Sequence, residues 1–492
     1  MKNIFIATIL GIIGHYQNVF AQDKPNIVII LADDLGYGEI SCQNEKALVA
    51  TPQIDKLAQN GIRFRDGHAA ASVCTPARYA LLAGQYCWRT QLQADVLKPY
   101  EEALISEETL TLPEMLKQNG YKTAMIGKWH LGLNYHLKKP GLNQHGSTKN
   151  KFAKAMSIDW TKPIGGGPVD HGFDWYWGEN VINYGPFTFI ENRHVVTPPT
   201  VVQDGKLTAS DWDETMVLPT NTKKAVEYIH KNSKLDKPFF LYFSMCSPHT
   251  PHVPTDMFKG ESGIGNYGDY IMETDWSIGQ VVQAISDAGI ANNTMIILTS
   301  DNGPEKHVYN LAVKHPGYHS AGPLRGVKRD LWEGGHRVPF IVSWPDRIQG
   351  PKISDQTITQ VDVMASLADL IGAKLNSGNS VDSYSVLPAL LGGKTDRSLK
   401  FPILHHRRDK FAIRQGDWLF IDYRTGNMNK PNDPMEFESL RKYEKSDYLG
   451  GLYNLKEDID ERFNLYNNYP EKVEELRELL LKLKTSSSTV RR

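Results

Sequence analysis

Five short apolar segments constrain the fold of this chain more than any other feature. The first, residues 25–32 (PNIVIILA), is a continuous run rich in β-branched side chains, as in a strand buried on both faces of a parallel sheet. The others are residues 122–126, 238–245, 294–299 and 338–343. Amphipathic, helix-like stretches lie between and after them, at 51–60, 110–118, 220–232, 269–288 and 360–370. This alternation predicts an α/β fold with a large, mostly parallel, doubly wound sheet flanked by helices.

Polar side chains follow four of these segments directly. In an open parallel sheet, ligands bind outside the carboxyl ends of the strands. If the four strands share one sheet, their polar ends converge on one edge, where we expect the functional site. The groups in question are Asp33 and Asp34, Lys128 and His130, His249, and Asp301 and Asn302.

The acidic and amide groups among them suit a hard metal ion. Taken singly, Asp33-Asp34 and Asp301-Asn302-Gly303 are typical of loops and helix caps. Brought together, they supply three carboxylates and one amide oxygen. Such an all-oxygen site fits Ca²⁺ or Mg²⁺ better than Zn²⁺, which prefers Cys and His ligands.

The cationic and imidazole groups suit an anionic substrate. Lys128, His130, His249 and Lys328 would each be unremarkable alone, as solvated or capping residues. Clustered beside a metal, they would hold a sulfate or phosphate group and protonate a leaving group. His252, three residues after His249, could compete for that role.

Cys74 precedes Pro76, a residue typical of the first turn of a helix. One interpretation is a buried structural cysteine. The other is a nucleophile whose pKa is lowered by the N-terminus of the helix.

The segment Cys74-Thr75-Pro76-Ala77-Arg78, followed by LLAG at 81–84, resembles the signature of the type I (formylglycine-dependent) sulfatases of the alkaline phosphatase-like superfamily. Five further segments resemble that family in order: 25–39, 127–132, 247–252, 299–305 and 322–339. The resemblance implies that Cys74 is oxidised to formylglycine (3-oxoalanine) by a formylglycine-generating or an anaerobic sulfatase-maturing enzyme. Its hydrate would then attack the sulfur of a sulfate ester. In the signature, Ala83 replaces the usual Thr and Gln85 a common Arg, and Tyr79 is bulkier than usual.

The resemblance also assigns roles to the predicted site residues. It implies that Arg78 holds the hydrate, that His130 takes up its proton, and that His249 protonates the leaving alcohol. Lys128, His249 and Lys328 would hold the sulfate oxygens. The implied Ca²⁺ ligands are Asp33, Asp34, Asp301, Asn302 and the modified Cys74.

The stretches CTPARY…YCWR and GYHSAGPLRGVK resemble exported bacterial carbohydrate sulfatases of the N-acetylgalactosamine/galactose-6-sulfatase or arylsulfatase A type. This implies exo-action on sulfated galactose or N-acetylgalactosamine in host or dietary glycans. Residues predicted to contact the sugar are Asp170, His171, His319 and Arg325. Two alternatives remain: a phosphodiesterase or phosphonate monoesterase of the same superfamily, and a non-catalytic binder of sulfated glycans.

We expect three parts in the chain. Residues 1–21 have the pattern of a secretory signal peptide, which indicates export, with the bacterial periplasm as the first hypothesis. Residues 22–384 would form the catalytic domain, with long loops at 135–215 over the strand ends. Residues 385–492 would form a small antiparallel sheet with one closing helix at 470–483. No other segment is apolar enough over a sufficient length to span a membrane.

Charge and cysteine content exclude two classes of protein. Lys and Arg number 55 and Asp and Glu 56, so the chain lacks the basic excess of a nucleic-acid binder. Four cysteines in 492 residues are too few for a disulfide scaffold. If Cys74 is modified, at most one disulfide forms within the chain, from two of Cys42, Cys87 and Cys246.

Overall fold

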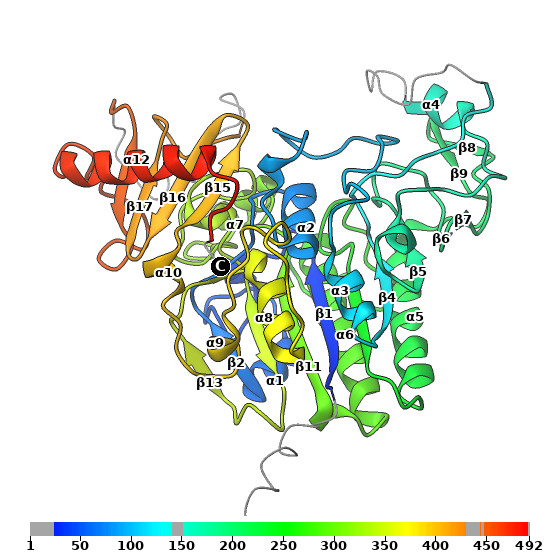
Figure 1. Ribbon diagram of the computed structural model, residues 1–492. Helices are drawn as coiled ribbons and strands as arrows, with labels where there is room; N and C mark the ends of the chain where they lie inside the picture. Colours follow the sequence, from blue (N-terminus) through cyan, green and yellow to red (C-terminus); the bar gives the residue numbers. More distant parts are fainter. Residues whose placement is uncertain (1–23, 140–150, 430–442, 444–446, 491–492) are drawn as a thin grey trace, which may run out of the picture.

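The computed structural model describes residues 24–139, 151–429, 443 and 447–490, and its main feature is a ten-stranded sheet (Figure 1). The strand order is β13-β2-β12-β11-β1-β10-β4-β5-β6-β7. Its centre is parallel and comprises β11 (Thr294–Ser300), β1 (Asn26–Ala32), β10 (Phe239–Ser244), β4 (Lys122–Gly127) and β5 (Trp175–Gly178). The four predicted strands that carry polar ends therefore do share one sheet.

The two sides of the sheet are mixed in direction. The predicted strand at 338–343 forms β12 (Phe340–Ser343), which runs antiparallel to both β11 and β2 (Gly61–Phe64). β13 (Lys352–Ser354) lies parallel to β2, and the short strands β6 (Ile190–Glu191) and β7 (His194–Val195) continue antiparallel beyond β5. The polar strand ends thus gather in the central part of the sheet, where neighbouring strands are all parallel.

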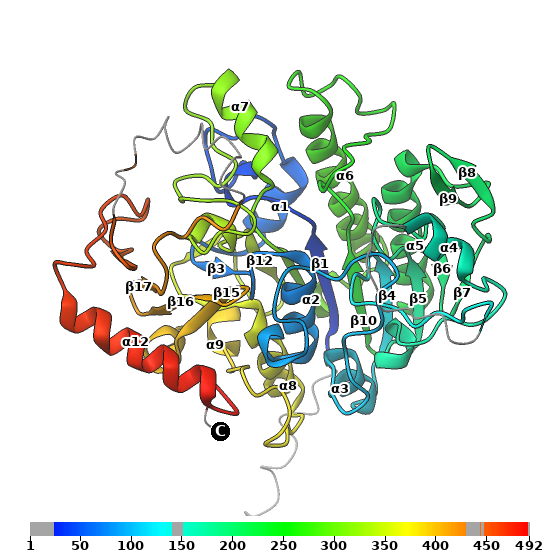
Figure 2. The same cartoon turned by 90° about the horizontal axis from the view of Figure 1, so that it is seen from above.

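Helices cover both faces of this sheet (Figure 2). α1 (Pro52–Gln59), α5 (Val217–Asn232) and α6 (Asn266–Asp287) cover one face. The other face carries α2 (Cys74–Ala83), α3 (Leu112–Gln118), α8 (Val363–Ile371) and α9 (Leu387–Leu390).

The side chains of β1 explain this arrangement. Because strand side chains alternate, Ile27 and Ile29 enter the core under α3 and α8, whereas Val28 and Ile30 enter the core under α5 and α6. All of β1 is buried, and each such aliphatic side chain contributes about 1.5–3 kcal/mol on burial. The doubly wound fold therefore follows from a strand that is apolar on both faces.

A second sheet is antiparallel, with β15 (Ile403–Arg407), β16 (Lys410–Gln415), β17 (Trp418–Ile421) and β18 (Gly451–Asn454) in that order. α12 (Pro470–Thr485) packs Leu476 and Leu480 against it. The predicted small sheet with one closing helix is confirmed, and Figure 1 shows it beside the upper part of the large sheet. The division at residues 384 and 385 stays a prediction.

The region 135–215 contains short elements where long loops were expected. Besides β5, β6 and β7, these are α4 (Lys151–Ser157), β8 (Val201–Gln203) and β9 (Lys206–Thr208). Elsewhere the minor elements are β3 (Gly67–His68), β14 (Ile358–Thr359), α7 (Tyr309–Lys314) and α10 (Arg397–Lys400).

Two predictions concern the ends of the chain and its compartment. The predicted signal peptide, residues 1–21, lies outside the described residues. Within the described ranges, no helix combines the length and the apolar character needed to cross a membrane. All four cysteines are described, and all four are free thiols.

Candidate active site

The carboxyl ends of the central strands bring the predicted polar residues together. Asp33 and Asp34 follow β1, Asp301 and Asn302 follow β11, Lys128 and His130 follow β4, and His249 lies beyond the end of β10. Cys74 is the first residue of α2, and Lys328 comes from the loop after α7. All of these side chains are buried except that of His249, which is 12% exposed.

Arg78 and Lys128 hold one half of the carboxylate cluster. The Nζ of Lys128 donates to Oδ2 of Asp33 at 2.6 Å. The guanidinium of Arg78 donates through Nε to Oδ2 of Asp301 at 2.9 Å, and its Nη2 lies 2.8 Å from the same oxygen. These charge-assisted bonds fix both carboxylates in a buried site where either one alone would be costly.

Lys328 and Asn302 hold the third carboxylate of the cluster, that of Asp34. The Nζ of Lys328 donates to both of its carboxylate oxygens, at 2.6 and 2.8 Å, and Nδ2 of Asn302 donates to Oδ1 at 2.7 Å. Asp34 has φ of 66°, a left-handed conformation that a non-glycine residue adopts at a cost of about 1–3 kcal/mol. The surrounding contacts hold this strained residue in place.

The ionisation of Asp34 and of Asp301 is shifted in this buried cluster. Burial alone would raise the pKa of Asp34, but Lys328 and His249 hold it well below its ordinary value. The pKa of Asp301 is raised by burial and by the negative charge of Asp33. A divalent cation among these groups would relieve the repulsion.

The donor set fits calcium. Asp33, Asp34 and Asp301 offer carboxylate oxygens, and Oδ1 of Asn302 is a buried oxygen with no hydrogen-bond partner among the described residues. A buried amide oxygen without a hydrogen-bond partner is uncommon, and this one is free to act as a ligand. Oxygen donors of this kind are those of Ca²⁺ sites.

Cys74 lies against this cluster as a neutral thiol. Its Sγ is 3.6 Å from Oδ1 of Asp33. Burial, followed by the negative charge of Asp301, raises the pKa of the Cys74 thiol to about 12. The expectation that the helix N-terminus lowers this pKa is therefore wrong, because burial and the carboxylates outweigh the helix dipole. An unmodified Cys74 would be a poor nucleophile at neutral pH.

His130 presents one unprotonated ring nitrogen. Its Nε2 donates to the carbonyl oxygen of Leu97 at 3.1 Å, and its Nδ1 is buried with no hydrogen-bond partner in the described part of the chain. Burial and the nearby charges of Lys128 and Arg78 keep the pKa of His130 well below its ordinary value. His130 is therefore a neutral imidazole with a free lone pair, suited to accept a proton.

His249 and His252 occupy different positions. Nε2 of His249 lies 3.8 Å from Oδ2 of Asp34, and Nδ1 donates to the carbonyl oxygen of Thr250 at 2.5 Å. Burial lowers the pKa of His249 to about 3. His252 instead contacts His307, with 3.2 Å between the Nε2 atoms, and its ring lies 4.9 Å from that of Tyr267, tilted by 59°. His249 therefore lies beside Asp34 and His252 does not, and the role of His249 in the reaction stays a prediction.

The four residues predicted to contact the sugar are spread over two regions. His171 is buried and stacks on Trp129, with ring centroids 6.3 Å apart, and Asp170 forms an ion pair with Arg193 at 2.5 Å. Arg325 lies over the ring of Trp332 at 3.8 Å. Nδ1 of the fourth residue, His319, accepts a hydrogen bond from the backbone N–H of Ala321 at 3.1 Å.

Two residues of the site were not predicted from the sequence. Ser244, the last residue of β10, accepts from Nη1 of Arg78 at 2.5 Å and donates to the carbonyl oxygen of Lys128 at 2.7 Å. Glu179 is buried, and its pKa is raised to about 7 by burial, against the nearby charge of Lys128. The position of Ser244 at a strand end was a usable signal, whereas nothing in the sequence around Glu179 distinguished it.

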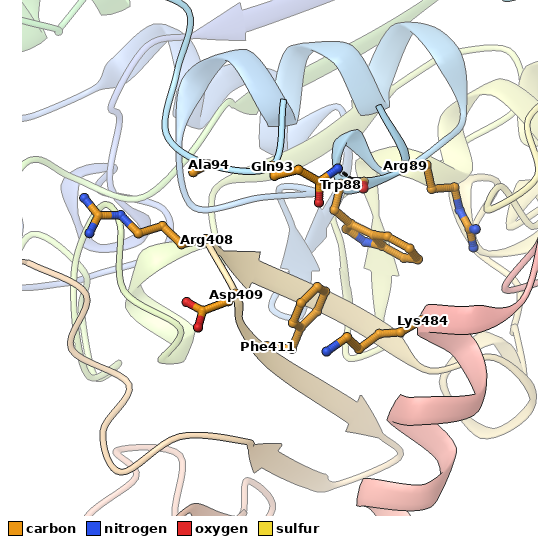
Figure 3. A pocket seen from close by; sticks show the side chains of 8 residues that line it. All are labelled: Trp88, Arg89, Gln93, Ala94, Arg408, Asp409, Phe411 and Lys484. Carbon is orange, nitrogen blue, oxygen red and sulfur yellow. Dashed lines mark hydrogen bonds between the residues drawn. The ribbon is translucent and has the colours of Figure 1, made fainter. Parts of the chain in front are cut away.

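A cavity of about 720 Å³ lies elsewhere, between the segment after α2 and the second sheet (Figure 3). Trp88 and Phe411 form part of its wall. Arg89 lies over the ring of Trp88 and is paired with Asp382, and Lys484 lies over the ring of Phe411. The lining cations are thus engaged with the protein, and the cavity contains none of the predicted catalytic residues.

Comparisons with known proteins identify the family of this chain. Residues 25–373 match the family model described as Sulfatase. The chain is 32% identical to an N-acetylgalactosamine-6-O-sulfatase of Bacteroides thetaiotaomicron, covering 94% of each chain, and 31% identical to human arylsulfatase A, covering 93% of this chain and 87% of that protein.

A solved structure gives the same answer for the fold. It is described in a study of the metabolism of multiple glycosaminoglycans by Bacteroides thetaiotaomicron, and it superposes with a TM-score of 0.78 at 29% identity. The match covers 94% of this chain and 100% of that one. Together, the matched family model, the relatives and this structure show that the chain belongs to the sulfatase family and is a sulfuric ester hydrolase.

Proposed function

We propose that the protein removes sulfate from carbohydrates, acting at a chain end on sulfated galactose or N-acetylgalactosamine in host or dietary glycans. The observation that carries this proposal is the meeting of Cys74, the carboxylate cluster and the two lysines at one sheet edge. The substrate class is supported by the 32% identity to an N-acetylgalactosamine-6-O-sulfatase.

We further propose that Cys74 is converted to formylglycine and that Asp33, Asp34, Asp301 and Asn302 hold Ca²⁺. The aldehyde hydrate would supply the nucleophilic oxygen that the neutral thiol lacks, and the cation would stabilise negative charge on the reacting oxygens. In support, the thiol has a raised pKa, and Oδ1 of Asn302 has no hydrogen-bond partner among the described residues. A formylglycine-generating or an anaerobic sulfatase-maturing enzyme would be the partner in this modification.

Of the three cations in the site, Lys128 and Lys328 would bind the sulfate and Arg78 would not. In the structure each donates to a carboxylate of the cluster. With the cluster neutralised by a cation, the two lysine ammonium groups would be available to sulfate oxygens. Arg78 would stay on Asp301, where it orients residue 74 from the same helix.

His130 would act as the base and His249 as the acid. The lone pair on Nδ1 of His130 is suited to accept a proton from the modified residue 74. His249 is neutral in the free site because burial and the positive charges of Lys328 and Lys128 disfavour its protonated form. A bound sulfate ester offsets those charges, so the pKa of His249 would rise when substrate is present, and the ring could then protonate the leaving alcohol.

His319 and Arg325 come from the loop that also supplies Lys328, so we propose this loop first for contacts with the sugar. Asp170 and His171 are the second pair that we propose for such contacts. We also retain the proposals of an N-terminal signal peptide at 1–21 and of export to the bacterial periplasm. They rest on the sequence pattern alone.

The test begins with the modification. Protein from a host that contains a maturation enzyme should yield a residue-74 peptide with the mass of the aldehyde, and Cys74→Ala should abolish turnover. Cys42→Ala, which removes a half-buried free thiol elsewhere, is the matched control and should retain activity.

The substrate is then found by screening the matured protein against galactose, N-acetylgalactosamine and N-acetylglucosamine sulfated at defined positions. Release of sulfate from 6-sulfated galactose or N-acetylgalactosamine supports the proposal. Faster turnover of aryl phosphates or phosphodiesters would replace it with the phosphodiesterase alternative.

A further inference from the structure

A second cluster of metal-binding side chains lies apart from the active site, between the two sheets. His68 belongs to β3, His336 lies before β12, and His405 belongs to β15, which lies beside β3 in Figure 2. One ring nitrogen from each histidine lies within 4.8 Å of the other two. All three side chains are at most 2% exposed, so the cluster is closed to bulk water.

The Nε2 atom of each ring contacts a hydrogen-bond acceptor of the protein. Nε2 of His405 donates to the carbonyl oxygen of Ala69 at 3.0 Å, and Nε2 of His336 donates to the carbonyl oxygen of Leu331 at 3.3 Å. Because a carbonyl oxygen only accepts, both Nε2 atoms carry the proton. In the neutral rings, the lone pairs are therefore on the Nδ1 atoms.

His68 follows the same pattern. Its Nε2 lies 2.9 Å from Oδ1 of Asp66. Arg414 donates to both oxygens of that carboxylate, at 2.8 and 2.7 Å, so Asp66 is ionised. Nη1 of Arg414 also lies 3.2 Å from Nε2 of His68, but it already donates to Asp66 and Glu333, and the contact of His68 with Asp66 is shorter, so we assign the Nε2 proton of His68 to the bond with Asp66. A histidine that binds a metal through one nitrogen almost always donates its other N–H to a carboxylate or a backbone carbonyl. His336 and His405 meet that condition, and His68 meets it in the assigned tautomer.

The Nδ1 atoms of two of the three histidines face each other. Nδ1 of His68 and Nδ1 of His336 are 3.2 Å apart. Two lone pairs at this distance repel unless a cation or a proton lies between them. In a tetrahedral site with Zn–N bonds of about 2.0–2.1 Å, two ligand nitrogens are about 3.3–3.4 Å apart, which matches the observed spacing.

We propose that His68, His336 and His405 bind one transition-metal ion of the Zn²⁺ class. Imidazole ligands suit this class, whereas the oxygen cluster at Asp33 and Asp34 suits Ca²⁺, so the protein would hold two metals of different chemistry. The rings of His336 and His405 are stacked with centroids 3.4 Å apart and planes at 11°, so one of them must turn for both lone pairs to reach the ion.

Such an ion would have a structural role. His68 and His336 come from the part of the chain that forms the large sheet, and His405 comes from the first strand of the second sheet. A metal bound by all three would tie the second sheet to the catalytic part. The proposal does not depend on the substrate or on the modification of Cys74.

The test uses the full-length protein without a polyhistidine tag, equilibrated with Zn²⁺ in excess Ca²⁺ and then freed of unbound metal. Elemental analysis should find one zinc per chain. His405→Gln should lose that zinc. His406→Gln is the matched control, because His406 is adjacent on β15 and stacks on Phe411 instead, and it should keep the zinc.

Cobalt gives a readout that does not require a variant of the cluster to fold. Wild-type protein loaded with Co²⁺ should show the visible bands of an imidazole-bound ion, and Cys74→Ala should leave these bands unchanged. Absence of zinc from the wild-type protein would overturn the proposal and leave a proton shared between His68 and His336. Equal zinc in wild type and His405→Gln, or cobalt bands that vanish in Cys74→Ala, would overturn it as well.

Discussion

Lys328 and Asp34 form a buried ion pair in which one ammonium group contacts both carboxylate oxygens, at 2.6 and 2.8 Å. The two residues are 294 positions apart in the chain. Burial would lower the pKa of Lys328, but Asp34 raises it well above its ordinary value, so the lysine is charged at neutral pH. The active site thus depends on a loop folding back over the end of β1.

Lys328→Met should lower kcat/KM for a sulfate ester by about 10²–10³-fold, because it removes a fixed charge that stabilises the anion in the transition state. Lys314→Met, on the exposed end of α7, is the matched control and should have wild-type kinetics. Steady-state kinetics on an aryl sulfate measure both. Equal activity of the two variants would remove Lys328 from the reaction.

His130→Ala should reduce kcat by about 10²–10⁴-fold while leaving substrate affinity nearly unchanged, as expected for loss of a proton acceptor. Because the pKa of His130 is held well below its ordinary value, the wild-type rate should not decline between pH 7 and pH 6 through this residue. A pH–rate profile of kcat, with binding measured separately, checks both statements. A large loss of affinity with kcat unchanged would instead indicate a binding role.

Removal of calcium should lower the melting temperature of the protein. An ion that binds only the folded state at 100 times its Kd stabilises that state by about 2.7 kcal/mol. Differential scanning calorimetry before and after chelation, with Ca²⁺ added back, measures this effect. The same experiment on Asp34→Asn should show a much smaller response to Ca²⁺, and an unchanged response would place the ion elsewhere.

Glu39 should make stability depend on pH. Burial raises the pKa of Glu39 from 4.5 to about 8, and its carboxyl accepts hydrogen bonds from the backbone N–H of Gly36 and the hydroxyl of Tyr267. Because the folded-state pKa lies above the unfolded one, its contribution is complete below pH 4.5 and is lost as pH rises towards 8. The slope is at most about 1.4 kcal/mol per pH unit.

Glu39→Gln should remove that slope, since glutamine does not titrate. The exposed Glu107→Gln is the matched control and should keep the slope of the wild type. Urea unfolding at several pH values between 5 and 8 measures the difference. Identical slopes in wild type and Glu39→Gln would show that Glu39 is not the titrating group.

The central strands and the convergence of their polar ends were predictable because β1 is apolar on both faces and Asp33 follows it immediately. The antiparallel direction of β12 was not, because a short buried strand has the same pattern in either direction. Direction is set by the path of the chain between residues 301 and 337, which residue patterns do not encode.

The pKa of Cys74 and the histidine cluster could not be predicted from the sequence either, because both depend on contacts between residues far apart in the chain. A helix N-terminus predicts a lowered thiol pKa, and only the structure shows Asp33 and Asp301 beside Cys74. His68, His336 and His405 are separated by 268 and 69 positions. Nothing in their sequence neighbourhoods relates them, so contacts between the two sheets were needed to find them.

The burial of Cys74 also bears on whether the proposed modification precedes folding. Cys74 is the first residue of α2, its side chain is 2% exposed and lies against Asp33, so no maturation enzyme can reach it once the protein has folded. The proposed oxidation to formylglycine would therefore have to occur on the nascent or unfolded chain. Under that proposal, a variant that folds before it is modified would accumulate as an intact but inactive protein, and the yield of active enzyme would depend on the relative rates of modification and folding.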